Sequence, residues 1–241
     1  MAVAAPSAPP ATFTGFTPGA IQFLADLAAN NDRAWFQPRK ADYERLLKAP
    51  MAAFVSALAG RLGVRGVPLD ADPVRSPYRI YRDTRFSRDK SPYKTHLGAS
   101  FPWAERVAAL DHTRGAGGYF HLAPGEVFVG GGMWHPDKPR LDAFRRAVAD
   151  EPARVHAAID DPAFRATFGS VNGDRLSRVP RGYSADHPEA ELLKLKDVVF
   201  GRRLSDAEAF SAQLPDVIAD ALAAAVPVLR LLASLAPVPP G

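Results

Sequence analysis

The sequence contains no cysteine among its 241 residues. This absence excludes disulfides, thiolate zinc sites, iron–sulfur clusters and a cysteine nucleophile. It is compatible with a reducing compartment, and we expect a cytoplasmic protein. Residues 1–12 are rich in alanine and proline and lack the basic start and apolar run of a secretory signal. We therefore predict disordered tails at residues 1–12 and 237–241.

Long hydrophobic runs are also missing. The most apolar stretch, residues 214–238, is interrupted by Asp216, Asp220, Pro227 and Arg230. It cannot supply the ~20 consecutive apolar residues that a membrane span requires. We expect no membrane partner, and we expect residues 13–236 to form a single domain.

Predicted strands lie in the middle of the chain, with predicted helices before and after them. The strands are predicted at residues 75–83, 94–101 and 195–204, with a hairpin within 118–132. The helices are predicted at residues 18–29, 38–62 with a break or offset near Pro50, 138–149, 152–159, 162–168, and from the Ser205–Glu208 capping box to about 235. This order predicts an α+β fold with a central, mainly antiparallel sheet flanked by N-terminal and C-terminal helices.

The hairpin within residues 118–132 carries Pro124-Gly125 at the two central turn positions, which is typical of a type II turn. If Ala123 pairs with Glu126, two faces follow from the alternation of a strand. One face carries Phe120, Leu122, Val127 and Val129. The other carries Tyr119, His121 and Phe128.

Recognised nucleotide-binding loops are absent from the sequence. The glycines at 130–132 are not followed by G-K-[ST], and no G-x-G-x-x-G connects a strand to a helix. We predict instead that these glycines allow a close approach of backbone at a strand end.

Positive charge is concentrated in one short segment, residues 75–96. The formal charge of the whole chain is +4. This segment alone has a charge of about +5, so the remainder is almost neutral. Its basic residues are Arg75, Arg79, Arg82, Arg85, Arg88, Lys90 and Lys94. The segment is therefore where we expect the function to lie.

Arginine forks bind phosphate or carboxylate with two parallel hydrogen bonds, and a neighbouring tyrosine adds a stacking surface and a hydroxyl. The predicted anion-binding residues are Arg79, Arg82, Arg85, Lys90, Tyr93 and Lys94. Asp83 and Asp89 are predicted to be structural partners of the arginines, since nearby positive charge makes a carboxylate a poor general base. His121, Trp134 and His135 are predicted to line the pocket.

Three functions remain open from the residues alone. The first is binding of a phosphorylated or carboxylated small molecule, with catalysis possible through His96, His121 or His135. The second is nucleic-acid binding by the same basic cluster. The third is an internal salt-bridge network with no ligand. We predict no cofactor and no metal, because a site of His121, His135 and Asp137 lacks any ligand spacing along the chain. The sequence does not predict the oligomeric state.

One segment also resembles a known family. Residues 79–93 read R-x-x-R-D-x-R-F-x-x-D-K-x-x-Y from Arg79 to Tyr93, with D-K at Asp89 and Lys90. This pattern resembles the signature of a bacterial family known as domain of unknown function 2461. The runs N-N-D-R-A-W-F at 30–36, G-Y-F-H at 118–121 and G-G-G-M-W-H-P at 130–136 are similar too, so the resemblance covers about residues 13–204. It implies no activity.

Overall fold

A four-stranded antiparallel sheet organises the structure, which is a computed structural model that describes residues 12–85, 87–105 and 115–235. The strands lie side by side in chain order. They are β1 (Leu97–Pro102), β2 (Gly117–Ala123), β3 (Glu126–Met133) and β4 (Val198–Arg203). Helices precede and follow them, so the predicted α+β class is confirmed. Except for Thr12, the predicted tails lie outside the described residues.

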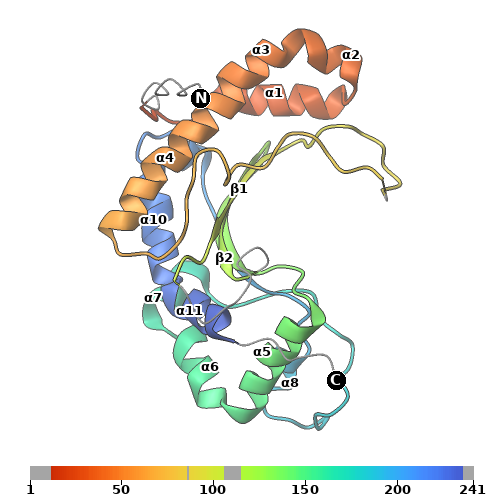
Figure 1. The fold of residues 1–241 in the computed structure, drawn as a ribbon, viewed down its shortest axis with the longest axis vertical. Helices are drawn as coiled ribbons and strands as arrows, with labels where there is room; N and C mark the ends of the chain where they lie inside the picture. The colour runs from red at the N-terminus through yellow and green to blue at the C-terminus, as the bar shows by residue number, and fades with distance from the viewer. Residues whose placement is uncertain (1–11, 86, 106–114, 236–241) are drawn as a thin grey trace, which may run out of the picture.

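The hairpin of β2 and β3 has the predicted register. Ala123 pairs with Glu126, and Gly125 has a φ of 72°, as the third position of a type II turn requires. The predicted core face is buried, with Phe120 and Val129 fully inaccessible. α4 (Ala49–Val64) and α10 (Leu214–Ala224) run along one side of the sheet (Figure 1).

The chain begins with α1 (Pro18–Ala29) and turns after it. A continuous helical run of 32 residues, Arg33–Val64, follows. It consists of α2 (Arg33–Phe36), the 3₁₀ turn η1 (Gln37–Arg39), α3 (Lys40–Tyr43), the π turn η2 (Glu44–Lys48) and α4. The break or offset predicted near Pro50 is an offset, the π turn that ends two residues before it, and the helix continues through the proline. A wider turn accommodates a proline, whose ring would clash with the carbonyl four residues earlier.

The run Arg33–Val64 is long and apolar enough to cross a membrane by length and composition, and the bent pair α10 and α11 (Val226–Ser234) passes the same test. Most of the large apolar side chains of the run are packed in or against the core, however, and among them only Val64 is largely exposed. The buried apolar residues of the run are Phe36, Leu47, Met51, Ala53, Phe54, Val55, Leu58 and Leu62. The run is therefore a core helix of the α+β domain.

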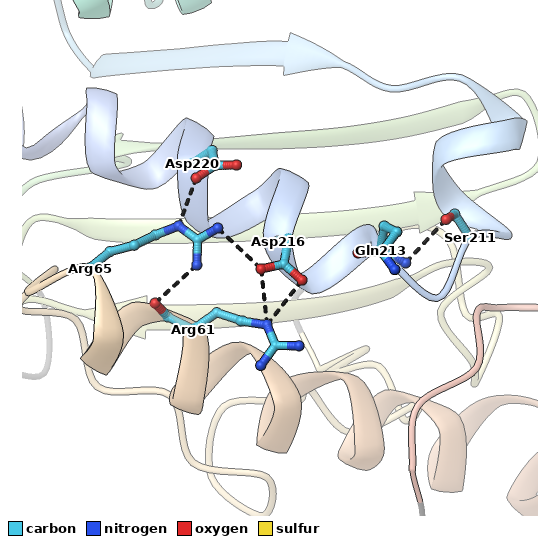
Figure 2. A network of polar contacts seen from close by, with 6 residues as sticks. All are labelled: Arg61, Arg65, Ser211, Gln213, Asp216 and Asp220. Carbon is cyan, nitrogen blue, oxygen red and sulfur yellow. Dashed lines mark hydrogen bonds and ion pairs between the residues drawn. The ribbon is translucent and has the colours of Figure 1, made fainter.

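The helices α4 and α10 are joined by ion pairs as well as by apolar packing. Arg61 and Arg65 of α4 both contact Asp216 of α10, and Arg65 also donates to Asp220 (Figure 2). The N–O distances are 2.6–3.1 Å. These four residues are called the helix cluster below.

The chain after β3 is mostly helical. It forms α5 (Lys138–Asp150), α6 (Pro152–Ile159), α7 (Pro162–Phe168), α8 (Ala190–Leu193), α9 (Asp206–Ala209), α10 and α11. The Ser205–Glu208 capping box is confirmed. The prediction of a single long C-terminal helix is wrong. α9 ends before α10 begins, and α10 and α11 meet at an angle of 55°. Pro215 and Pro227 each lie in the first turn of a new helix, where the missing N–H is tolerated.

The glycines at the end of β3 allow the predicted close approach. A Cβ on Gly130 would lie 2.3 Å from the Phe200 carbonyl oxygen, and one on Gly132 would lie 2.0 Å from that of Val198. Gly132 also has a φ of 114°. Side chains at these positions would separate β3 from β4.

The described part of the basic segment, residues 76–85 and 87–96, forms an extended hairpin, which we call the arm. It leaves the edge of the sheet beside β1, and Figure 1 shows it in yellow reaching away from the sheet. Tyr81 pairs with Tyr93, and the amides of Arg82 and Lys94 donate across the hairpin at 2.9 and 2.7 Å. The continuous strand predicted at residues 75–83 is wrong, because only isolated bridges form. Pro77 and Pro92 lack the N–H groups that a regular ladder would need.

Candidate functional site

An open cleft of about 570 Å³ lies where the arm meets the C-terminal end of α1. It is lined by Ala28, Asn31, Arg82, Asp83, Asp89, Ser91, Tyr93, Lys94, Thr95 and His96. Three of the six predicted anion-binding residues line it, namely Arg82, Tyr93 and Lys94, together with both predicted aspartates. Arg79, Arg85 and Lys90 lie on the arm but are not among the lining residues.

Tyr93 anchors the arm to the helical part of the protein. Its ring is 1% exposed and stacks on Phe36 with the ring centroids 4.1 Å apart. The Asn31 side chain binds both backbone groups of Tyr93, donating to its carbonyl and accepting from its amide at 3.0 Å each. Burial raises the pKa of the Tyr93 hydroxyl, which therefore stays protonated. The residue predicted to contact an anion thus fixes the wall of the cleft.

Arg82 is held in place by one end of its guanidinium. Its Nη1 donates to the Asp89 carboxylate and, at 3.3 Å, to the Ser91 carbonyl. Hydrogen bonds from the Ser91 hydroxyl and amide, and then from Arg82, hold the pKa of Asp89 well below its usual range. Within the described part of the chain, Nε and Nη2 of Arg82 have no acceptor. Arg82 therefore has a fixed orientation and unused donors.

Asp83 and Lys90 have their partners within the tip of the arm. Asp83 binds Arg85 at 2.7 Å, and this hydrogen-bonded pair lowers the pKa of Asp83 to about 2. The Lys90 ammonium donates to the Thr84 carbonyl at 2.9 Å. Asp83 and Asp89 are thus each paired with an arginine, and the cleft keeps both carboxylates ionised at neutral pH.

Lys94 and Arg79 bring two positive charges together beside the cleft. The Lys94 ammonium donates to the Arg79 carbonyl at 2.7 Å and lies 5.6 Å from the centre of the Tyr78 ring. Burial, and then the charge of Arg79, lower the pKa of Lys94. Neither cation forms an ion pair with a carboxylate of the described residues. Arg79 acts on Asp83 only at longer range.

A cluster of aromatic and imidazole rings extends from His96, at the edge of the cleft, across the neighbouring strands of the sheet. His96 stacks on His121 with centroids 4.7 Å apart, and His121 stacks on Phe128 at 4.8 Å. His121 Nδ1 is 3.1 Å from the Tyr119 hydroxyl, and its Nε2 is 3.9 Å from the Glu126 carboxylate. His121, predicted to line the pocket, therefore reaches it only through His96.

Burial sets the charge of this cluster. Burial, and then the neighbouring His121 and Lys94, lower the pKa of His96 to about 4. Burial also lowers the pKa of His121, and burial raises the pKa of Tyr119 to about 12. At pH 7 both imidazoles are therefore neutral and the phenol is protonated.

Trp134 and His135 lie away from the cleft. They follow the end of β3, while Phe128 near its start pairs with His121. Trp134 is six positions after Phe128 in the chain, which corresponds to ~20 Å along an extended strand. The Trp134 side chain is 75% exposed, and the His135 amide donates to the buried Asp197 at 2.6 Å. The fold does not bring these two predicted residues to the arm.

The cleft also contains residues that were not predicted to line the pocket, although His96 was considered for catalysis. Asn31, Ser91 and Thr95 line it, and His96 connects it to the sheet. Asn31 lies 62 residues before its partner Tyr93, so no local pattern relates them. Among the described residues, no group of three or more His, Asp or Glu side chains is arranged to hold a metal ion.

Comparison with known proteins gives one match. A family model described as "Conserved hypothetical protein (DUF2461)" matches residues 19–230, which include the arm, the cleft and the ring cluster. No curated protein and no solved structure matches the chain.

Proposed function

This chain belongs to the DUF2461 family of conserved hypothetical proteins, and we propose that it binds a phosphorylated or carboxylated small molecule in the cleft at the root of the arm. The observation that carries the proposal is the adjacent pair of cations, Lys94 and Arg79. Neither is ion-paired with a carboxylate of the described residues, although the arm contains two carboxylates. We place this function in the cytoplasm, which agrees with the lack of cysteine.

An anion would relieve an unfavourable arrangement at Lys94. Partial burial and the charge of Arg79 both disfavour the ammonium form, which is why the pKa of Lys94 is lowered. An anionic group between the two cations would reverse the second effect and satisfy ammonium donors that the Arg79 carbonyl leaves unused. The binding energy would come from charge-assisted hydrogen bonds.

Arg82, which also lines the cleft, supports the same proposal. Its orientation is fixed by Asp89, while its Nε and Nη2 donors are without acceptors in the described residues. A side chain that is already ordered loses little rotamer freedom when it binds a ligand. Asp89 therefore positions an arginine rather than competing for all of its donors.

The shape of the site favours a small molecule over a polymer. The volume of about 570 Å³ lies in the range of small-molecule pockets. A nucleic acid would instead contact the exposed cations along the tip, Arg85 and Lys90. The ion pairs Arg82–Asp89 and Arg85–Asp83 agree with a structural network for those arginines, but such a network does not include Lys94 and Arg79.

Calorimetric titration with sulfate tests the proposal, because sulfate remains a dianion throughout the neutral range. We expect Lys94→Met to weaken sulfate binding about tenfold or more, the effect of losing one charge-assisted hydrogen bond. Arg79→Gln should weaken it less, because Arg79 lies beside Lys94 but does not line the cleft. Arg85→Gln is the matched control. It removes one positive charge from the same arm, at a residue paired with Asp83 and outside the cleft lining.

Two results would overturn the proposal. If Arg85→Gln weakens sulfate binding as much as Lys94→Met does, binding follows the charge of the arm and not the cleft. If a single-stranded oligonucleotide binds more tightly than small anions, with an affinity that falls steeply with salt, the arm is a nucleic-acid surface.

A further inference from the structure

We infer that His96 selects the ligand of this cleft by accepting a hydrogen bond, so that the ligand carries a hydroxyl group next to its anionic group. The inference rests on the proposed function and adds the class of ligand, a phosphorylated or carboxylated hydroxy compound. Lys94 and Arg82 would bind the anionic end, and His96 would bind the hydroxyl.

The position of His96 is fixed by its ring contacts. One face of the imidazole stacks on His121 at 4.7 Å with the planes 27° apart. His96 also lines the cleft, only two residues from Lys94. Stacking covers a face of the ring and leaves its edge, which carries both nitrogens, available for hydrogen bonds. Within the described residues, neither ring nitrogen of His96 has a hydrogen-bond partner.

The surroundings of His96 determine which hydrogen bond it can make. The titratable groups acting on it are His121 of β2, Lys94 of the arm and Glu126 at the start of β3. Burial and the first two hold its pKa at about 4, so the ring is neutral at pH 7. A neutral imidazole offers one N–H and one bare nitrogen acceptor. A hydroxyl can satisfy that acceptor, whereas a second anionic group cannot.

The size of the cleft agrees with a ligand of this kind. A volume of about 570 Å³ is much larger than a phosphate or carboxylate group alone, so a carbon skeleton is accommodated. Ser91 and Thr95 also line the cleft and add further hydroxyl partners. A polar skeleton therefore fits these walls better than an alkyl chain.

Two probes with the same carbon chain test the inference, namely sn-glycerol 3-phosphate and propyl phosphate. We expect the wild-type protein at pH 7.5 to bind the hydroxylated probe about fivefold more tightly, the usual effect of one hydrogen bond. His96→Phe keeps a ring that can stack on His121, so we expect it to bind propyl phosphate as the wild type does and to lose the preference. His121→Phe is the matched control. It changes the next ring of the stack and should keep the preference, because the nitrogens of His121 are directed to Tyr119 and Glu126.

The outcomes separate this inference from the proposed function. If neither probe binds to the wild type, the proposed function fails. If both bind with equal affinity, the cleft binds anions but the hydroxyl selection is overturned. If His96→Phe retains the preference, the assignment to His96 is overturned. A loss of the preference in His96→Phe alone, with propyl phosphate affinity unchanged, supports it, since a purely structural role would change both affinities together.

Discussion

The helix cluster and the arm are both built from arginine and aspartate, yet they differ in how the charges are matched. In the helix cluster, Arg61 and Arg65 meet Asp216 and Asp220, so each cation has a carboxylate (Figure 2). The partners are 151–155 residues apart in the chain. These pairs therefore join two helices that pack against each other.

In the arm the pairs are local and the charges are unequal. Asp83 binds Arg85 two residues away, and Asp89 binds Arg82 seven residues away. Lys90 and Lys94 donate to backbone carbonyls, which leaves their charge uncompensated. Pairs within one hairpin cannot fix that hairpin to the rest of the protein. The charges of the helix cluster therefore serve packing, whereas the arm carries cations that no carboxylate of the described residues matches, which agrees with the proposed function.

This comparison requires that something other than charge holds the arm, and Tyr93 is the residue that does so. Tyr93→Ala removes a fully buried ring from the stack with Phe36, and we expect it to destabilise the protein by about 3 kcal/mol or more, as for other buried aromatic truncations. Urea unfolding would measure the loss. Amide hydrogen exchange should show faster exchange at Arg82 and Lys94, whose amides bond across the hairpin.

Tyr81→Ala is the control for this prediction, because Tyr81 lies on the same hairpin but is 48% exposed. We expect it to change stability by much less. If Tyr81→Ala and Tyr93→Ala cost the same, the arm is not anchored through Tyr93 and the comparison loses its basis.

The next largest expected effect is the loss of stability at low pH. The ring cluster and the arm should lose stability in different pH ranges. The pKa of His96 is about 4 in the folded protein and about 6.5 when unfolded. The unfolded chain therefore binds more protons between these values, so stability is complete above pH 6.5 and falls as the pH drops toward 4. His121, whose pKa is also lowered, acts in the same direction. The Asp83 pair acts lower, since its pKa of about 2 means that its contribution is lost only below pH 4.

His96→Phe tests the higher of these two pH ranges, from pH 6.5 to pH 4. We expect the thermal unfolding temperature of the variant to fall less between pH 7 and pH 5 than that of the wild type, because one group that resists protonation is gone. Asp83→Asn should leave the change over this interval as it is. An unaltered pH dependence in His96→Phe would mean that the buried imidazole is not what makes the fold sensitive to acid.

Local features of the fold could be predicted from the sequence, since each depends on a few adjacent residues. The Pro124-Gly125 turn specified the β2–β3 register, and the capping box of Ser205 and Glu208 specified the start of α9. The extended form of the arm also followed from its composition. The prolines were harder to interpret, since Pro50 follows a π turn inside one continuous helix while Pro227 begins a new helix.

The candidate site could be predicted only as far as the signature reaches. Arg82, Tyr93 and Lys94 lie within one short segment, and all three line the cleft. Asn31 and His96 were not connected to them, because a contact between residues 31 and 93 depends on how α1 packs beside the arm. Trp134 and His135 were assigned to the pocket from residue type, and the length of β3 carries them to its other end.

The smallest expected effects come from a pair of substitutions that compares the helix cluster directly with the arm. Asp216→Asn removes a carboxylate shared by Arg61 and Arg65, so it should lower the unfolding temperature slightly and leave sulfate affinity unchanged. Asp83→Asn removes a carboxylate from the cleft wall and should act mainly on binding. The exposed Asp83–Arg85 pair contributes little stability at neutral pH, so the unfolding temperature should fall less than in Asp216→Asn. Sulfate binding should strengthen by about twofold, for one exposed charge in salt solution. Both substitutions exchange an aspartate for its amide, and each is the control for the other. If Asp83→Asn lowers the unfolding temperature as much as Asp216→Asn does and does not improve binding, the arm is an internal salt-bridge network of the same kind as the helix cluster.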